Sequence, residues 1–430
     1  MSRIFYGWYI VAASLVVMAF GIGGGLYLFG VLLPSLLLEF AWTHAEVSGA
    51  NSVAMIVMGI LGPFMGRLID RYGPRMLMST SAVCCGLGFG AQALVARLPA
   101  LNDVAAPLTQ LYCCYVVYGA GLAGIGYVPV NTIVSRWFIR RRGLALGIAA
   151  VGVGLGGFLI VPAGWLIDRL GWRAATAIIG ATITTIVLPL AVFVLKRHPE
   201  EMGLAPDGRD VDASATRAHA ADGPAIERTS PAAELLMSRT FWALALAFGI
   251  YTVTVTIVRV FGIAVLQEKG MPPPGARFVM SALAMSGILG KIVFGALTDR
   301  LPPQLVATAA FVLAAIGTLF LLGPASAFDV ALFAVVYGLP MGGIAALQPV
   351  LIAEYFGPSS FATVYGTLVL LLTIGAAAGP VIAGRVYDLG GGYLPTLIAC
   401  SLASGAAAVL MMAAQRASVS MKDGVTAIEF

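Results

Sequence analysis

The sequence predicts an all-α integral membrane protein, with twelve transmembrane helices arranged in two six-helix bundles. Three observations support this fold class: the composition, the division of the apolar residues into long runs, and a short pattern that recurs four times. Hydrophobic residues make up 60% of the chain and charged residues 10%, whereas soluble domains are about 45–50% apolar and about 25% charged. The run 10–37 exceeds the roughly 20 residues that cross a bilayer as a helix. Backbone polar groups in lipid must be satisfied internally, so such runs are predicted to be helices.

The apolar runs fall into two sets of six, separated by one long polar stretch. The first predicted spans lie near 7–34, 47–68, 75–97, 107–133, 143–167 and 172–195. The second lie near 240–265, 275–298, 304–323, 328–352, 361–385 and 392–414. The stretch 196–239 is rich in Ala, Pro, Asp, Glu and Arg, which predicts a mostly disordered linker. The predicted divisions are therefore an N-terminal bundle, a linker, a C-terminal bundle and a tail: 1–195, 196–239, 240–414 and 415–430.

The distribution of arginine predicts the orientation in the membrane. The loops after the second and fourth spans carry Arg67, Arg71, Arg75, Arg136, Arg140, Arg141 and Arg142. The loops on the other side of the first half carry only Arg97, Arg169 and Arg173. Positive charge stays on the cytoplasmic side, so both termini, the linker and the tail are expected there, in a multi-pass protein of the inner (plasma) membrane. No basic face is visible that would bind a nucleic acid. The long apolar runs instead predict contact with membrane lipid.

The pattern Gly-x-x-x-Asp closes one span in every set of three. It occurs at Gly66–Asp70, Gly164–Asp168, Gly295–Asp299 and Gly384–Asp388. Transporters build two rocking halves from internal repeats of this kind. The glycines allow close helix contact, and each aspartate can cap a helix or pair with an arginine. We therefore expect a conformational latch formed by Asp70, Arg71, Asp168, Asp299, Arg300 and Asp388; the alternative is static charge at the interface.

Several segments resemble one transporter family. Residues 66–75 resemble the major facilitator superfamily signature GxxxDRxGxR. Segments 6–9, 137–147, 357–361 and 379–388 are similar to the monocarboxylate transporter family and its bacterial relatives, which include oxalate/formate exchangers. The resemblance covers nearly the whole chain apart from the linker and the tail. It implies the major facilitator fold and secondary transport by alternating access.

The resemblance also implies a substrate site on the eighth span. In the family a cation there, usually arginine, binds the substrate carboxylate, and Lys291 falls on that position. An ionisable residue inside a span is costly and usually functional. The alternative is a lysine that extends to the headgroups, but about two helical turns, on the order of 12 Å, separate Lys291 from the span end. For Arg259 in the seventh span, this alternative and a gate or second substrate contact both stay open.

Four tyrosines are candidate substrate contacts. Tyr127 matches a position that often lines the site in the bacterial relatives. Tyr27, Tyr118 and Tyr337 are candidates from the first, fourth and tenth spans. A phenol can donate a hydrogen bond to a carboxylate, although packing or lipid contact would also explain each of these residues.

The implied substrate is a small monocarboxylate of the lactate or pyruvate type, carried by a monomer with the proton as coupling ion. Exchange of organic anions of the oxalate/formate type is the alternative, since Arg259 could supply the second cation that a dianion needs. No Asp, Glu or His lies deep in a predicted span, so we hypothesise that Lys291 itself carries the proton. Desolvation disfavours its charged form, and an arriving carboxylate favours it.

Other classes of function find no support in the sequence. The glycines at 119–124 and 152–157 match a dinucleotide-binding pattern, but they lie inside apolar spans without a preceding strand. The five cysteines lack metal-site spacing, and the three histidines lie in predicted loops. No catalytic residue, metal site or cofactor is therefore expected. A sensor would carry a folded soluble domain, which the linker is too short and polar to form.

Overall fold

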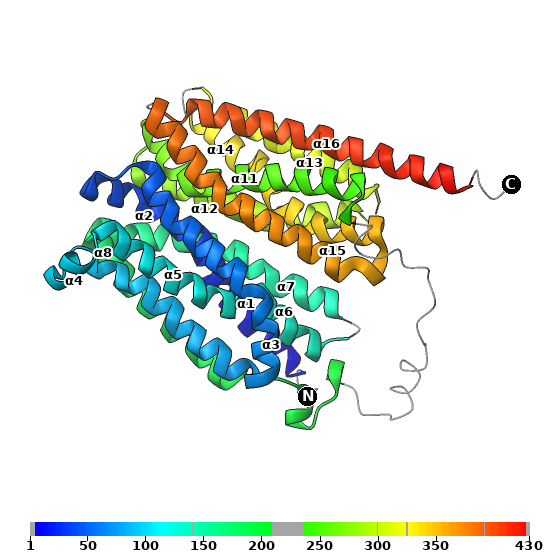
Figure 1. Ribbon diagram of the computed structural model, residues 1–430, viewed down its shortest axis with the longest axis horizontal. Coiled ribbons are helices and arrows are strands. Elements are labelled where there is room, and N and C mark those ends of the chain that lie inside the picture. The colour runs from blue at the N-terminus through cyan, green and yellow to red at the C-terminus, as the bar shows by residue number, and fades with distance from the viewer. Residues whose placement is uncertain are drawn as a thin grey trace.

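A computed structural model describes residues 5–139, 141–208, 236–298, 300–323, 326–390 and 392–426. The described residues form helices that fall into two groups (Figure 1). The first group, blue to cyan, runs from α1 to α8, and the second, green to red, from α11 to α16. The all-helical membrane fold class is confirmed.

The first group corresponds to the first six predicted spans. Its helices are α1 (Gly7–Met18), α2 (Gly24–Phe40), α3 (His44–Gly90), α4 (Pro99–Val104), α5 (Pro107–Ile125), α6 (Tyr127–Trp137), α7 (Arg142–Leu155) and α8 (Ile160–Pro189). A π-helical turn, η1 (Ala19–Gly23), joins α1 to α2, and a 3-10 turn, η3 (Gly156–Leu159), joins α7 to α8. Each of these pairs continues one apolar run, so the first and fifth spans cross the bundle with a local change of helix geometry.

The second group corresponds to the last six predicted spans. Its helices are α11 (Arg239–Glu268), α12 (Pro273–Thr298), α13 (Pro303–Leu319), α14 (Ala327–Val336), α15 (Gly338–Gly390) and α16 (Leu394–Thr426). The last helix continues beyond residue 414 into the segment that was predicted to be a tail, and it projects past its neighbours in Figure 1.

Ten helical segments of the described chain are long and apolar enough to cross a membrane. Two segments account for the difference from the predicted twelve. Leu144–Val194 has 51 residues, which at about 1.5 Å per residue exceeds twice the roughly 30 Å of a bilayer core. The apolar helix Pro303–Leu319 is shorter than the ten others. The count of twelve spans therefore stays a prediction.

Glycine reverses the chain between consecutive spans of the first half. Gly73 lies within α3 at φ 79°, and Gly171 lies within α8 at φ 81°. Each follows an aspartate of the repeat, Asp70 or Asp168, by three residues. Only glycine adopts this left-handed conformation without a Cβ clash, so the repeat specifies the turn as well as the helix end.

The helix ends define two ends of the molecule. The linker end carries Trp137, where the indole Nε1 donates a hydrogen bond to the Lys196 carbonyl at 3.2 Å. The distal end carries Phe40, His44 and the start of α12. The linker begins as an ordered segment, because the Asp207 carboxylate accepts a hydrogen bond from the Ile139 amide at 3.1 Å. Residues 209–235 lie outside the described residues.

The glycines at 119–124 are packing residues, as the sequence indicated. A Cβ on Gly119 would lie 2.5 Å from the carbonyl oxygen of Ala54, and one on Gly121 would overlap Cys85. Both neighbours belong to α3, so these glycines bring α5 against α3.

Candidate functional site

The candidate site lies between the two halves and is organised around Lys291 of α12. Its Nζ donates a hydrogen bond to the carbonyl oxygen of Ala150 on α7, in the other half, at 2.9 Å. Small residues permit this approach, because a Cβ on Gly154 or Gly157 would overlap Ile288 or Ala284 of α12. In the described structure, Lys291 therefore bonds inside the interface and does not extend to the linker end.

Arg259 of α11 supplies a second cation near Lys291. The two side chains lie within electrostatic reach of each other. The guanidinium carbon is 5.5 Å from the centroid of the Tyr27 ring, which is the geometry of a cation–π contact. The Nε of Arg259 is buried, and no group in the described part of the chain accepts a hydrogen bond from it.

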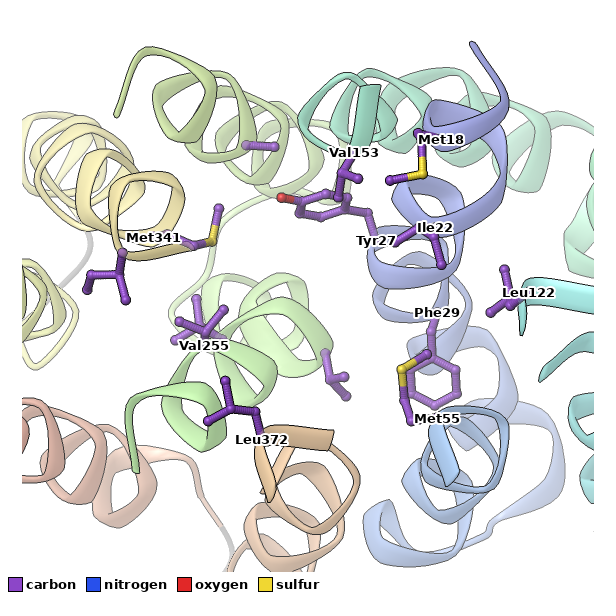
Figure 2. Packing of buried hydrophobic residues seen from close by; sticks show 14 of the residues in the cluster. Met18, Ile22, Tyr27, Phe29, Met55, Leu122, Val153, Val255, Met341 and Leu372 are labelled. Atoms are coloured by element: carbon purple, nitrogen blue, oxygen red, sulfur yellow. The ribbon is translucent and has the colours of Figure 1, made fainter. Parts of the chain in front are cut away.

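The π-helical turn η1 precedes Tyr27 and changes the face that α2 presents. Gly23 of this turn lies directly against Gly156 of η3, since a Cβ on Gly23 would be 2.8 Å from the Gly156 Cα. Figure 2 shows the Tyr27 ring pointing away from α2, beside Val153 and toward the half that carries Met341. The ring is 3% exposed and forms a buried aromatic surface under Arg259.

Tyr127 is the most accessible of the predicted tyrosines. It is the first residue of α6, directly after the break at Gly126, and it is 46% exposed. Pro129 explains the break, because proline has no amide hydrogen and its ring displaces the carbonyl four residues earlier. Tyr127 lies within electrostatic reach of Arg259, Tyr27 and Tyr365. Residues from four helices, α2, α6, α11 and α15, therefore lie near one another.

Tyr365 was not identified from the sequence. It lies on α15, half-buried, near Tyr127. In the sequence, Tyr365 is a tyrosine near the start of an otherwise apolar predicted span. Nothing in that local pattern indicates that it lies near Tyr127, which belongs to the opposite half. Only the packing of the two bundles brings Tyr365 to the other candidates.

Tyr118 and Tyr337 occupy the interiors of their own halves. Tyr118 is 1% exposed, and its ring centroid is 5.3 Å from that of Phe89. Tyr337 is fully buried and stacks on Phe333 at 5.6 Å, with Arg259 in electrostatic reach. Their positions favour the packing alternative, and a substrate contact stays a prediction for both.

The two cations have no acidic partner in the part of the chain that the structure describes. No carboxylate there lies within ion-pair distance of Lys291 or Arg259. Uncompensated charge inside a membrane protein is costly, so the region is electrostatically suited to an anion. The arrangement can bind a carboxylate through two cations and a phenol.

Two of the repeat aspartates join the halves at the distal end. The first contact joins Asp168 of α8 to Arg277 of α12, whose two terminal guanidinium nitrogens donate to the carboxylate, with Nη2 and Oδ1 2.9 Å apart. The second joins Asp388 of α15 to the start of α3, where the amides of His44 and Ala45 donate hydrogen bonds to its oxygens at 2.9 Å and 3.1 Å. The repeat aspartates at the distal end therefore both bind the opposite half.

His44 was predicted to lie in a loop, and it is instead the first residue of α3. Its Nδ1 lies 3.2 Å from Asp388 Oδ1, and its ring centroid is 3.8 Å from that of Tyr387. The distal contact at Asp388 thus combines two backbone amides and an imidazole.

The linker-end members of the predicted latch are less defined. Arg71 and Arg300 are exposed, and the Arg71 guanidinium lies 5.3 Å from the Tyr72 ring centroid. The side chain of Asp70 and the whole of Asp299 lie outside the described residues. The linker-end latch therefore stays a prediction.

Two helical halves meet around the half-buried Lys291 and Arg259, and two such halves are the architecture of many membrane transporters. The chain belongs to the Major Facilitator Superfamily: the model of this family matches residues 15–380 and again 244–426. The second match begins in the C-terminal half, as expected for a chain built from repeats.

Curated relatives and solved structures agree with this assignment. The chain is 26% identical to "Monocarboxylate transporter 13" of Bos taurus, over 91% of this chain and 85% of the relative. It is also 26% identical to "Monocarboxylate transporter 11" of Homo sapiens, over 91% and 79%. A bacterial homologue of the lysosomal transporter Spinster, in an inward-facing unoccupied conformation, superposes with a TM-score of 0.68 at 17% identity, covering 98% of this chain and 99% of that one. The D-xylose-proton symporter gives 0.69 at 15% identity, with 94% and 97% coverage. The resemblance predicted from the sequence motifs is confirmed.

Proposed function

We propose that the protein carries a small monocarboxylate of the lactate or pyruvate type across the inner membrane, together with a proton. The observation that carries this proposal is the position of Lys291 and Arg259, two neighbouring cations between the halves with no carboxylate partner among the described residues. The similarity to monocarboxylate transporters supports the same class of substrate.

The linker end faces the cytoplasm in this proposal, because the arginine-rich loops lie there. The distal end then faces outward, and the contacts at Asp168 and Asp388 hold it closed. Alternating access requires these contacts to break when the substrate site opens outward.

Organic-anion exchange is the second candidate, and a specific observation favours it. Arg259 lies close enough to Lys291 for both to bind one ligand, and a dianion would compensate both charges. A monoanion compensates only one of the two charges. Proton symport therefore requires Lys291 to be neutral in the empty site and to take up a proton when the monoanion binds.

Uptake by purified protein in liposomes distinguishes the two. A panel of labelled mono- and dicarboxylates is offered with and without an imposed pH gradient, and with and without anion inside. Accumulation of a monocarboxylate driven by the pH gradient supports proton symport. Uptake that requires internal anion and ignores the pH gradient supports exchange.

Substitutions at Lys291 test the role of the cation. Lys291→Ala is expected to abolish measurable uptake at substrate concentrations near the KM of the parent, since loss of a hydrogen bond to a charged group, about 1.5–3 kcal/mol, weakens affinity about 10–150-fold. Lys291→Arg is expected to keep anion exchange but to lose accumulation driven by a pH gradient, because arginine stays protonated. Lys269→Ala is the matched control, since Lys269 lies at the distal end and donates to the Gly323 carbonyl at 2.8 Å.

Each outcome is decisive for one part of the proposal. Normal uptake by Lys291→Ala would overturn the anion-binding role. Accumulation by Lys291→Arg equal to that of the parent would overturn the proton-carrying role and leave anion binding intact.

A further inference from the structure

The two distal contacts are related by the internal repeat, but they differ in chemistry. The internal repeat aligns Gly66 with Gly295 and Asp70 with Asp299. In the same alignment, which we call the repeat register, His44 and Ala45 correspond to Pro273 and Pro274. The first pair supplies the two backbone amides that bind Asp388. The second pair begins α12, at the place where Asp168 meets the opposite half.

Proline carries no amide hydrogen, so the start of α12 cannot bind Asp168 as the start of α3 binds Asp388. Arg277 lies about one turn further along α12 and donates from both of its terminal nitrogens to Asp168. In the repeat register its counterpart is Ser48, which donates to the carbonyl of His44 within its own helix.

The surroundings of Arg277 fit a contact between the halves. Its side chain is 9% exposed, whereas that of Asp168 is 44% exposed. A Cβ on Gly164 would overlap the Arg277 side chain, so the glycine of the repeat gives the arginine its space. At the other contact, a Cβ on Gly384 would lie 2.7 Å from the amide nitrogen of Ala45.

We propose that Arg277 replaces the amides that Pro273 and Pro274 remove, so that the distal gate closes through one ion pair and one helix cap. The ion pair, Asp168–Arg277, needs a charge on each partner and a planar fork. The helix cap, Asp388 on α3, needs mainly an acceptor oxygen, which asparagine also provides. This assignment concerns gate closure and does not depend on the identity of the substrate.

The test measures the distance across the distal end by pulsed electron paramagnetic resonance. Spin labels are attached to cysteines at Leu38 and Phe328, which are 88% and 71% exposed at the distal ends of the two halves. The five native cysteines are first replaced in the full-length protein. The ratio of long to short distances then reports the open and closed populations, in lipid nanodiscs and without substrate.

Arg277→Met and Asp168→Asn are each expected to raise the open-to-closed ratio about tenfold or more, as expected for a lost hydrogen bond between charged groups. Asp388→Asn is expected to raise it only about two- to threefold, because a capping oxygen remains. Exchange of the two charges, Asp168→Arg with Arg277→Asp, should return the ratio toward that of the parent.

The decisive variant restores the amides. Pro273→Ala with Pro274→Ala, added to Arg277→Met, gives α12 two N-terminal amides that Asp168 can bind, and it should lower the open-to-closed ratio again. Pro272→Ala, which changes the residue before the helix, is the matched control and should not. Failure of the double proline replacement to lower the ratio, or equal effects of Asp168→Asn and Asp388→Asn, would overturn the proposal. Size-exclusion profiles identify variants that misfold. Arg277→Lys then replaces Arg277→Met, with a smaller rise in the ratio because lysine keeps the charge but not the planar fork.

Discussion

A single methyl group at Gly30 should shift the balance between the open and closed distal end. Gly30 lies on α2, and a Cβ there would be 2.7 Å from the carbonyl oxygen of Arg259 and 3.0 Å from that of Val260, both on α11. Real Cβ atoms essentially never approach other heavy atoms within 3.0 Å, and the obstructing atoms are backbone. Gly30→Ala therefore requires the two helices, and with them the two halves, to separate.

The size of the effect follows from the cost of overpacking. An added methyl group in a close-packed contact costs about 1–3 kcal/mol. Because this contact joins the halves, the cost falls on the state in which the distal end is closed. Each 1.4 kcal/mol corresponds to a factor of ten, so the open-to-closed ratio is expected to rise about 5–150-fold.

The spin-label pair at Leu38 and Phe328 measures this ratio directly. Gly249→Ala is the matched control, because Gly249 lies on α11 and a Cβ there would have nothing within 4 Å. The control also accounts for the higher helix propensity of alanine, about 1 kcal/mol. If Gly30→Ala and Gly249→Ala gave the same distance distribution, the close approach of α2 and α11 would not determine closure.

Three further predictions follow from individual residues. Gly73→Ala should lower the free energy of unfolding in detergent by roughly 1–2 kcal/mol, because the chain turns there at φ 79°; unchanged thermal stability would contradict this. Tyr127→Phe should raise the KM for the carboxylate about two- to tenfold with little change in kcat, through loss of one neutral hydrogen bond; an unchanged KM would show that the phenol does not bind substrate. Asp70→Asn should slow turnover at saturating substrate without weakening affinity, since the residue is predicted to act in the linker-end latch; loss of affinity at a normal maximal rate would contradict that role.

The fold class was predictable because the bilayer imposes simple rules on composition. Long apolar runs must be helices, and the repeat at Asp168 and Asp388 marks where such helices end. The described part of the structure contains ten candidate spans where the sequence predicts twelve, in part because the chain reverses at Gly171 inside one continuous helical segment. The sequence nevertheless separates two spans there, 143–167 and 172–195, and the positive φ of Gly171 marks the turn between them.

The candidate site was only partly predictable. Lys291 and Arg259 were found because charge inside a span is unusual. Tyr365 and Arg277 were missed because their significance depends on the opposite half: Tyr365 lies near Tyr127, and Arg277 binds Asp168. A sequence gives the content of each helix, but the pairing of residues between two bundles is set by packing that no local pattern records.

The repeat explains why glycine and aspartate occur together at the helix ends. At the distal end, each glycine lacks the side chain that would separate the halves, and the aspartate one turn later binds the element that comes close. Gly164 lies against Arg277, which Asp168 binds. Gly384 lies against the start of α3, which Asp388 binds. The glycine therefore makes the contact sterically possible, and the aspartate makes it favourable. The same residues recur at the linker end as Gly66–Asp70 and Gly295–Asp299. A transporter that alternates between two closed ends needs such a contact at each end, and the contacts must be individually weak enough to break. Hydrogen bonds at an interface reached by water meet this requirement, because water replaces them when the halves separate.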